Sequence, residues 1–145
     1  MINIIPMELK HIDEVAEIES EANIISWSKK SLSNELKKRY AIYFVAIENN
    51  IVLGYCGMYH IVDEGHITNI AVKLDHRKNG IGSRLIDKII QTAISKKMIG
   101  VTLEVRLSNI IAQRLYTKNG FKIYGFRKNY YSEPREDAVI MWKYF

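Results

Sequence analysis

A strongly amphipathic segment follows a glycine-containing loop in the middle of this chain. From Leu85 to Ile94, apolar side chains recur at the three- and four-residue spacing of a helix that buries one face. The loop before it, residues 77–83, has the sequence Arg-Lys-Asn-Gly-Ile-Gly-Ser and follows a strand-like stretch near residues 66–73. A helix with one apolar face has to bury that face against another element, so the pattern favours a layered domain of helices on a sheet.

The other periodic segments predict the order strand, two helices, three strands, helix, strand, helix and two strands. Asn49-Asn50 is typical of a hairpin turn. No linker or repeat interrupts the chain, so we expect one α/β (or α+β) domain over residues 1–145. The predicted strands lie near residues 2–5, 43–47, 51–53, 66–73, 101–106, 121–127 and 137–144. The predicted helices lie near residues 11–21, from Ser28 or Ser31 to Arg39, 85–94, and from Asn109 to the residue before Gly120.

Charge and cysteine content narrow the classes of function. The 145 residues include 21 Lys or Arg and 16 Asp or Glu, and the net charge of +5 suits an anionic ligand such as a nucleotide, or a nucleic-acid-containing partner. Cys56 is the only cysteine, so we expect no intrachain disulfide and interpret it as a buried apolar side chain. The four histidines lack metal-ligand spacing, and we expect no metal site. Because no secretory signal and no membrane-length apolar run is visible, we expect a cytoplasmic protein.

The glycine loop has the properties of a phosphate-binding site. Its glycines allow several backbone N–H groups to approach one anion, and the start of the following helix adds partial positive charge. Arg77 and Lys78 add formal charge. The loop is not a Walker motif, and it fails the dinucleotide pattern because Leu85 stands where a third glycine is needed. The alternative is a simple turn at Asn79-Gly80, with Gly82 admitting the chain into the helix.

Two polar residues stand out in the following strand and helix. Residues 101–106 alternate apolar and polar side chains, which places Glu104 on the polar face of a strand. Taken alone, Glu104 is a solvent-facing carboxylate, paired with Arg106 on the same face. Tyr116, taken alone, is a boundary tyrosine with its hydroxyl in water. Asn109 is typical of a helix N-cap.

Several ordered motifs resemble those of the GNAT acetyltransferases, and in particular the RimI-type ribosomal-protein-alanine N-acetyltransferases. The resemblance extends over essentially the full length of the chain. It implies the GNAT fold, a central mixed and mostly antiparallel sheet of about seven strands flanked by about four helices. The motifs are Trp27-Ser28, Asn69-Ile70-Ala71-Val72, Arg77 with Gly80 and Gly82, Leu103-Glu104-Val105-Arg106, Ser108-Asn109, Ala112, Leu115-Tyr116, Gly120-Phe121, Arg127, Asn129-Tyr130-Tyr131, Glu136-Asp137-Ala138 and Met141.

The resemblance implies acetyl-CoA as co-substrate. Backbone groups of Ile70, Ala71 and Val72 would bind the pantetheine arm, and Asn109 would contact the arm or the acceptor side. The implied pyrophosphate-binding residues are Arg77, Lys78, Asn79, Gly80, Ile81, Gly82 and Ser83.

The resemblance also implies catalytic and acceptor-binding residues. Glu104 takes the position of the general base, and Tyr116 that of the acid that protonates the departing CoA thiolate. Trp27, Tyr130 and Tyr131 would bind the acceptor. An α-amino group has a pKa of about 7.7–8.0 and is roughly a tenth neutral at pH 7, so one carboxylate is enough to take its proton.

The acceptor that we expect is a protein N-terminus, namely the N-terminal alanine of a small-subunit ribosomal protein. A lysine side chain or a small amine is the alternative acceptor within the same enzyme class. Outside it, a non-enzymatic acyl-CoA sensor and an RNA-binding module that uses the basic loop and the tyrosines are the alternatives. We expect no direct nucleic-acid role and no membrane association.

Overall fold

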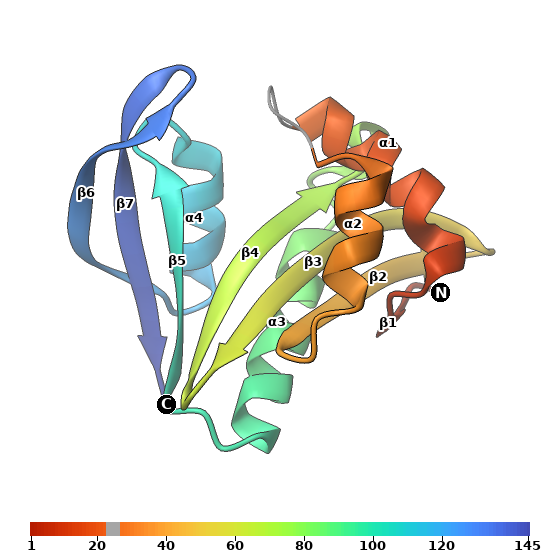
Figure 1. The fold of residues 1–145 in the computed structure, drawn as a ribbon, viewed down its shortest axis with the longest axis horizontal. Coiled ribbons are helices and arrows are strands. Elements are labelled where there is room, and N and C mark those ends of the chain that lie inside the picture. Colours follow the sequence, from red (N-terminus) through yellow and green to blue (C-terminus); the bar gives the residue numbers. More distant parts are fainter. Residues whose placement is uncertain (23–26) are drawn as a thin grey trace.

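The computed structural model describes residues 1–22 and 27–145, which form a seven-stranded sheet with helices on both faces (Figure 1). Across the sheet the strands are ordered β1-β2-β3-β4-β5-β7-β6. The strands are β1 (Asn3–Pro6), β2 (Ala41–Glu48), β3 (Ile51–Ile61), β4 (Glu64–Val72), β5 (Gly100–Arg106), β6 (Lys122–Ser132) and β7 (Arg135–Tyr144). The helices are α1 (Ile12–Ala22), α2 (Lys29–Leu36), α3 (Ile81–Ser95) and α4 (Ile110–Lys118), with 3-10 turns η1 (Leu9–His11) and η2 (Leu74–His76).

The predicted order of elements and the mixed sheet are confirmed. Only β4 and β5 run parallel within the described sheet, and the other neighbours are antiparallel. The parallel pair is the one that α3 connects, as expected for a crossover between parallel strands. Among the described residues, no helix has both the length and the hydropathy needed to cross a membrane.

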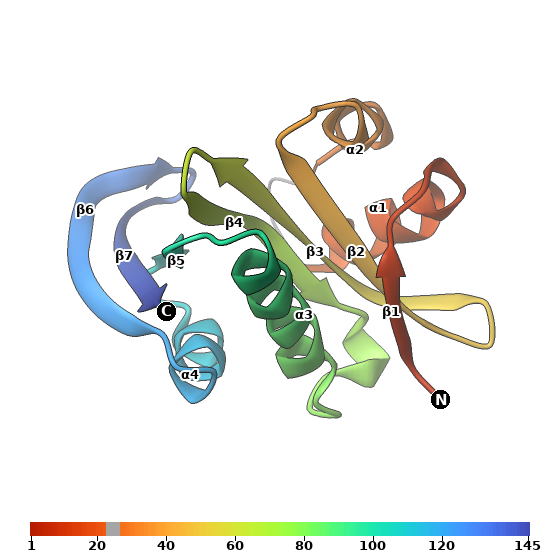
Figure 2. The ribbon, with the colours of Figure 1, turned by 90° about the horizontal axis from the view of Figure 1, so that it is seen from below.

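The sheet separates two apolar clusters. In β2, Phe44 and Ala46 belong to a larger cluster with α3, whereas Tyr43 and Val45 belong to a smaller cluster with α1 and α2. Helices α1 and α2 therefore cover one face, and α3 and α4 cover the other (Figure 2). The apolar face predicted for α3 is buried, with one exception. Ile94, in the last turn of α3, was predicted to lie on this face, but its side chain is 49% exposed.

Local signals account for several element ends. The Ser28 hydroxyl accepts a hydrogen bond from the Ser31 N–H at 3.1 Å, so Ser28 is the N-cap of α2, which ends before the predicted Arg39. Gly120 follows α4 with a φ of 94°. The turn at Asn49-Asn50 is confirmed, since both residues have positive φ values, 53° and 64°.

Strand lengths were predicted poorly. β3 continues to Ile61, eleven residues in all, although its predicted segment ended at Leu53. β6 and β7 also extend into the hairpin between them, through Ser132 and from Arg135. Glycines and charged residues within these segments resemble turn signals, but backbone pairing with neighbouring strands keeps the chain extended.

Candidate active site

The sheet opens between β4 and β5. These strands share three residue pairs, ending at His66↔Thr102, and then diverge (Figure 1). The rest of β4 stays paired with β3, and the rest of β5 with β7. Residues 67–72 and 103–106 therefore turn unpaired backbone edges toward each other; we call this region the β4–β5 opening. Such edges can bind an extended chain that carries amide groups.

A β-bulge shapes the β4 side of the opening. Gly57 of β3 pairs with Asn69, whereas its neighbour on β3 pairs with Ile67, which leaves Thr68 as the extra residue. The bulge turns two successive side chains to the α1–α2 face: Thr68 Oγ1 and Asn69 Oδ1 lie 3.3 and 3.4 Å from the Tyr43 hydroxyl.

Past the bulge, the predicted pantetheine-binding residues have their side chains in the core. Ile70 and Val72 pack against the larger cluster, and Ala71 is buried in the smaller one. Only their backbone groups can therefore face the opening. Asn109 is the N-cap of α4, and its Oδ1 accepts a hydrogen bond from the Ala112 N–H at 3.1 Å, so the capping role is confirmed.

The glycine loop leads into the N-terminus of α3. Gly80 is the N-cap residue and provides no side chain to cap the helix. The first-turn N–H groups of Ile81, Gly82 and Ser83 have no acceptor within an α-helix. They are available to an anion, with the helix dipole adding to the attraction. Lys78 has a φ of 69°, which turns the chain sharply just before the helix.

The two loop glycines serve different needs. A Cβ on Gly80 would meet nothing within 4 Å, but its φ of 77° is one that other residues rarely adopt. A Cβ on Gly82 would lie 3.0 Å from Leu115 Cδ2, so this glycine allows α3 to approach α4 closely. Backbone conformation therefore favours glycine at position 80, whereas at position 82 a Cβ would crowd the end of the Leu115 side chain on α4.

The other loop residues are held in distinct ways. Arg77 Nε donates to the Val72 carbonyl at 3.1 Å, which ties the loop to the end of β4. Asn79 is exposed, and the side chain of Ile81 is buried in the larger cluster. The Ser83 hydroxyl accepts a hydrogen bond from the C-cap asparagine of α4 at 3.2 Å.

Glu104 lies on the face of β5 opposite α3 and α4. Its neighbours Leu103 and Val105 are buried in the larger cluster, so strand alternation turns Glu104 the other way. Its side chain is 23% exposed, and its Oε1 lies 3.6 Å from Arg127 Nε on β6. The ion-pair partner of Glu104 is therefore Arg127, and not Arg106 as in the alternative interpretation of Glu104 taken alone.

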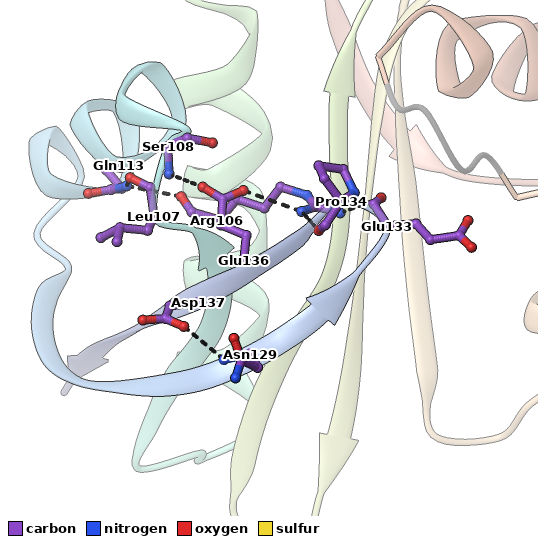
Figure 3. A network of polar contacts seen from close by, with 9 residues as sticks. All are labelled: Arg106, Leu107, Ser108, Gln113, Asn129, Glu133, Pro134, Glu136 and Asp137. Atoms are coloured by element: carbon purple, nitrogen blue, oxygen red, sulfur yellow. Dashed lines mark hydrogen bonds and ion pairs between the residues drawn. The ribbon is translucent and has the colours of Figure 1, made fainter.

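Arg106 is instead engaged with the β6–β7 hairpin (Figure 3). Its guanidinium donates to the carbonyls of Glu133 and Pro134 at 3.0 and 2.9 Å, and pairs with Glu136 at 3.3 Å. Glu136 also accepts a hydrogen bond from the Ser108 N–H at 2.6 Å. The hydrogen bond from Ser108 and the nearby guanidinium lower the pKa of Glu136. These contacts fix the hairpin at the end of β5, two residues from Glu104.

The hairpin tyrosines pack beside these charges. The two rings meet edge to face, with centroids 5.1 Å apart. The Arg106 guanidinium lies 4.2 Å from the centre of the Tyr131 ring, and that of Arg127 lies 5.6 Å from the Tyr130 ring. Burial raises the pKa of Tyr131 to about 12, and the charge of Glu104 acts in the same direction. The structure therefore brings both tyrosines into the neighbourhood of Glu104.

Tyr116 is buried rather than a boundary residue. It is 5% exposed, and its ring packs edge to face on Phe121, with centroids 5.6 Å apart. Burial raises its pKa, and the neighbouring Cys56 and Tyr131 contribute in the same sense. The phenol consequently keeps its proton at all physiological pH values.

Trp27 belongs to the other side of the β4–β5 opening. The Trp27 side chain packs against the smaller cluster, and the backbone N–H of Trp27 donates a hydrogen bond to Glu19 Oε2 at 3.3 Å. Trp27 directly precedes the α2 N-cap on the α1–α2 face of the sheet, whereas the tyrosine-bearing hairpin joins β6 and β7 at the other end of the sheet (Figure 1). The contact of Trp27 with an acceptor stays a prediction.

The interpretation of Cys56 as a core residue is confirmed. It is fully buried, and burial raises its pKa far above neutral pH. In the part of the chain that the structure describes, no three His, Cys, Asp or Glu side chains gather as metal ligands.

The sequence was also compared with protein families and with known proteins. Residues 12–121 match the Acetyltransferase (GNAT) family. This chain belongs to the GNAT acetyltransferase family. A Bacillus subtilis protein is 41% identical over 137 residues, which cover 94% of this chain and 91% of that protein. The ribosomal protein bS18-alanine N-acetyltransferase of Haemophilus influenzae is 36% identical, with 93% of each chain covered.

The fold of this GNAT acetyltransferase is also that of a solved relative. The crystal structure of the ribosomal-protein-S18-alanine N-acetyltransferase from Escherichia coli matches with a TM-score of 0.90 at 29% identity, covering 99% of this chain and 94% of that one. GNAT acetyltransferases use acetyl-CoA, so this enzyme is an acetyl-CoA-dependent acetyltransferase.

Two buried carboxylates in this GNAT chain were missed by the sequence analysis. Glu19 of α1 accepts a hydrogen bond from the Tyr55 hydroxyl at 2.5 Å. Glu35 of α2 accepts hydrogen bonds from the hydroxyls of Tyr43, at 2.8 Å, and Tyr59. Glu19 follows the buried Val15 by four positions, and Glu35 follows the buried Leu32 by three, which places each glutamate on the apolar face of its helix. This spacing could have predicted from the sequence that both carboxylates are buried.

Proposed function

We propose that this enzyme transfers the acetyl group of acetyl-CoA to the N-terminal alanine of a small-subunit ribosomal protein. The observation that carries the proposal is the match, over more than nine-tenths of both chains, to relatives that bear this activity in their names. The position of Glu104 on the face of β5 opposite α3 and α4, next to the β4–β5 opening, supports it.

Two features of the chain fit acetyl-CoA. The pyrophosphate would lie on the free N–H groups at the start of α3, with Arg77 and Lys78 nearby. The amide-bearing pantetheine arm would lie in the β4–β5 opening, bonded to backbone groups of Ile70, Ala71 and Val72. Bound there, acetyl-CoA supplies an activated acetyl thioester.

Glu104 would act on the acceptor amine. As the nitrogen bonds to the acetyl carbon and the carbon–sulfur bond breaks, the amine must lose a proton, and the Glu104 carboxylate accepts it directly or through a water. An α-amine needs less assistance than a lysine side chain, because its pKa lies about two to three units lower. A single carboxylate next to the opening is therefore adequate for an N-terminal acceptor.

Tyr116 would supply the proton that the leaving sulfur needs. Its raised pKa keeps the phenol protonated, and its ring lies in the larger cluster with Leu103 and Val105 of β5. Attack by the amine is direct in this proposal, because Cys56, the chain's only thiol, is buried and protonated. Tyr130 and Tyr131 on the hairpin, and Trp27 on the opposite side, would hold the first residues of the acceptor.

The test measures CoA release from acetyl-CoA with two peptides. One has a free N-terminal alanine, and the other is N-blocked with an internal lysine. Glu104→Gln is compared with wild type and with Glu17→Gln, a control on an exposed residue of α1. Turnover of the free alanine peptide alone, lost in Glu104→Gln and kept in the control, supports the proposal.

The other outcomes identify the alternatives. Turnover of the lysine peptide alone would refute the N-terminal acceptor and keep the acetyltransferase. No turnover of either peptide while acetyl-CoA still binds would leave a different acceptor, such as a small amine, or a non-enzymatic sensor. Salt-dependent RNA affinity that CoA leaves unchanged would favour an RNA-binding module.

A further inference from the structure

Two arginines face Glu104's side of the sheet, and they are held very differently. Arg106 of β5 and Arg127 of β6 both pair with Ala138 of β7, one on each side of it. Directly opposed residues on neighbouring strands share a face, and Glu104 lies two positions before Arg106, so all three charges project from one face.

Arg106 is a structural residue. Its guanidinium makes three polar contacts with the hairpin (Figure 3). It also lies over the Tyr131 ring, and its side chain is 29% exposed. Moving it would release both the hairpin carbonyls and Glu136. It is therefore not available to exchange partners.

Arg127 is held loosely. Its guanidinium is 56% exposed and makes one ion pair, at 3.6 Å, with Glu104, and one ring contact, at 5.6 Å, with Tyr130. Exposed ion pairs of this length contribute little to stability and break readily. After Arg127 the β6–β7 register skips and resumes at Tyr131↔Glu136, so the segment beyond it is not held by a regular ladder. Arg127 can leave Glu104 without disturbing the hairpin anchor.

We propose that Arg127 occupies, on Glu104, the place that the acceptor's ammonium group takes during the reaction, and that acceptor binding displaces it toward Tyr130. Arg127 is a positioning residue in this scheme: it holds the carboxylate in place in the free enzyme and competes with the acceptor. The inference rests on the proposed function, because it concerns the amine that Glu104 receives.

The exchange has a chemical consequence. An arginine guanidinium does not give up its proton in proteins, so Glu104 cannot act as a base toward it. An α-ammonium group loses its proton near neutral pH. Displacement therefore replaces a permanent cation beside the base with one that can be deprotonated. A ligand without a free amine has no cation that could replace Arg127 on Glu104. Its affinity should therefore not depend on whether Arg127 is displaced.

The test compares Arg127→Ala, Arg127→Lys and the control Arg135→Ala, which removes an exposed hairpin cation that pairs with Ser132 only through the strand backbone. Steady-state kinetics give KM and kcat for an alanine-terminated peptide. Calorimetry with the CoA-bound protein gives the affinity for that peptide and for its Nα-acetylated form. Because Arg127→Ala removes the competing cation, it should lower KM about two- to fivefold and leave kcat unchanged. This fold-change corresponds to the free energy that exposed ion pairs contribute.

Three further results are expected. Arg127→Lys should return KM toward the wild-type value, Arg135→Ala should leave it unchanged, and the affinity for the acetylated peptide should not improve in Arg127→Ala. A KM that stays the same or rises in Arg127→Ala, or an equal gain for both peptides, would overturn the inference while leaving the proposed function intact. Wild-type enzyme that neither binds nor acetylates the free-amine peptide would refute the proposed function, and this inference with it.

Discussion

Gly57 is a position where one added methyl group should destabilise the fold strongly. A Cβ there would lie 2.3 and 2.6 Å from ring atoms of Tyr43 and 2.7 Å from Thr68 Oγ1. The Tyr43 ring cannot move away freely, because its hydroxyl donates to the buried Glu35 carboxylate at 2.8 Å. The substitution Gly57→Ala must therefore displace a buried ring and break or lengthen that hydrogen bond.

The magnitude follows from these two losses. Overpacking a well-packed core costs typically 1–3 kcal/mol. A hydrogen bond to a charged group contributes about 1.5–3 kcal/mol. We expect Gly57→Ala to lower the free energy of unfolding by about 3–5 kcal/mol. Gly125→Ala is the matched control, because its Cβ would meet only Ile140 Cδ1, at 3.9 Å, and it should change stability by less than about 1 kcal/mol.

Urea unfolding followed by far-UV circular dichroism measures both variants. In a Tyr43→Leu background the ring is absent, so the additional cost of Gly57→Ala should fall, and a double-mutant cycle gives the coupling. If Gly57→Ala were as stable as Gly125→Ala, or if its cost were the same with and without the tyrosine ring, the packing argument would be wrong.

The other predictions concern the active site and its supporting helix. Glu104→Gln should lower kcat/KM by about 10²- to 10⁴-fold. Tyr116→Phe should lower it by less, because a thiol with a pKa near 8.5 is a good leaving group even without an acid. Steady-state kinetics in which Tyr116→Phe is the more damaging variant would contradict these roles. Because burial raises the pKa of Tyr116, the neutral phenol stabilises the fold fully below the unfolded-state pKa of 10.0, and this contribution is lost as pH rises above it. The free energy of unfolding should therefore fall above pH 10, and less steeply in Tyr116→Phe; equal slopes in alkaline urea titrations would count against this. Asn109→Ala should cost about 0.5–2 kcal/mol through the lost N-cap of α4, and an unchanged urea midpoint would exclude that role.

Features that depend on a few consecutive residues were predicted well. Helix α3 was predicted because its apolar spacing repeats over several turns, and the cap at Asn109 because a short polar side chain reaches the N–H three residues ahead. For α2, the structure chose Ser28 over Ser31, the other candidate cap. The hairpin at Asn49-Asn50 depends on two residues that tolerate positive φ. In each case the pattern is formed by residues that lie close together in the sequence.

Features that depend on distant partners were not predicted. The burial of Tyr116 depends on Phe121 and on a sheet assembled from strands far along the chain. Glu19 and Glu35 are acceptable on apolar faces only because tyrosines of β2 and β3 reach them with hydroxyl groups.

The sequence by itself determined which face of β5 carries Glu104 and that an amphipathic helix follows the glycine loop, because periodicity acts over a few residues. The tertiary structure alone decided that Glu104 meets Arg127 rather than Arg106. It also decided where β4 parts from β5. Strand pairing brings together residues tens of positions apart, and no local pattern specifies the side chain that lies across the next strand.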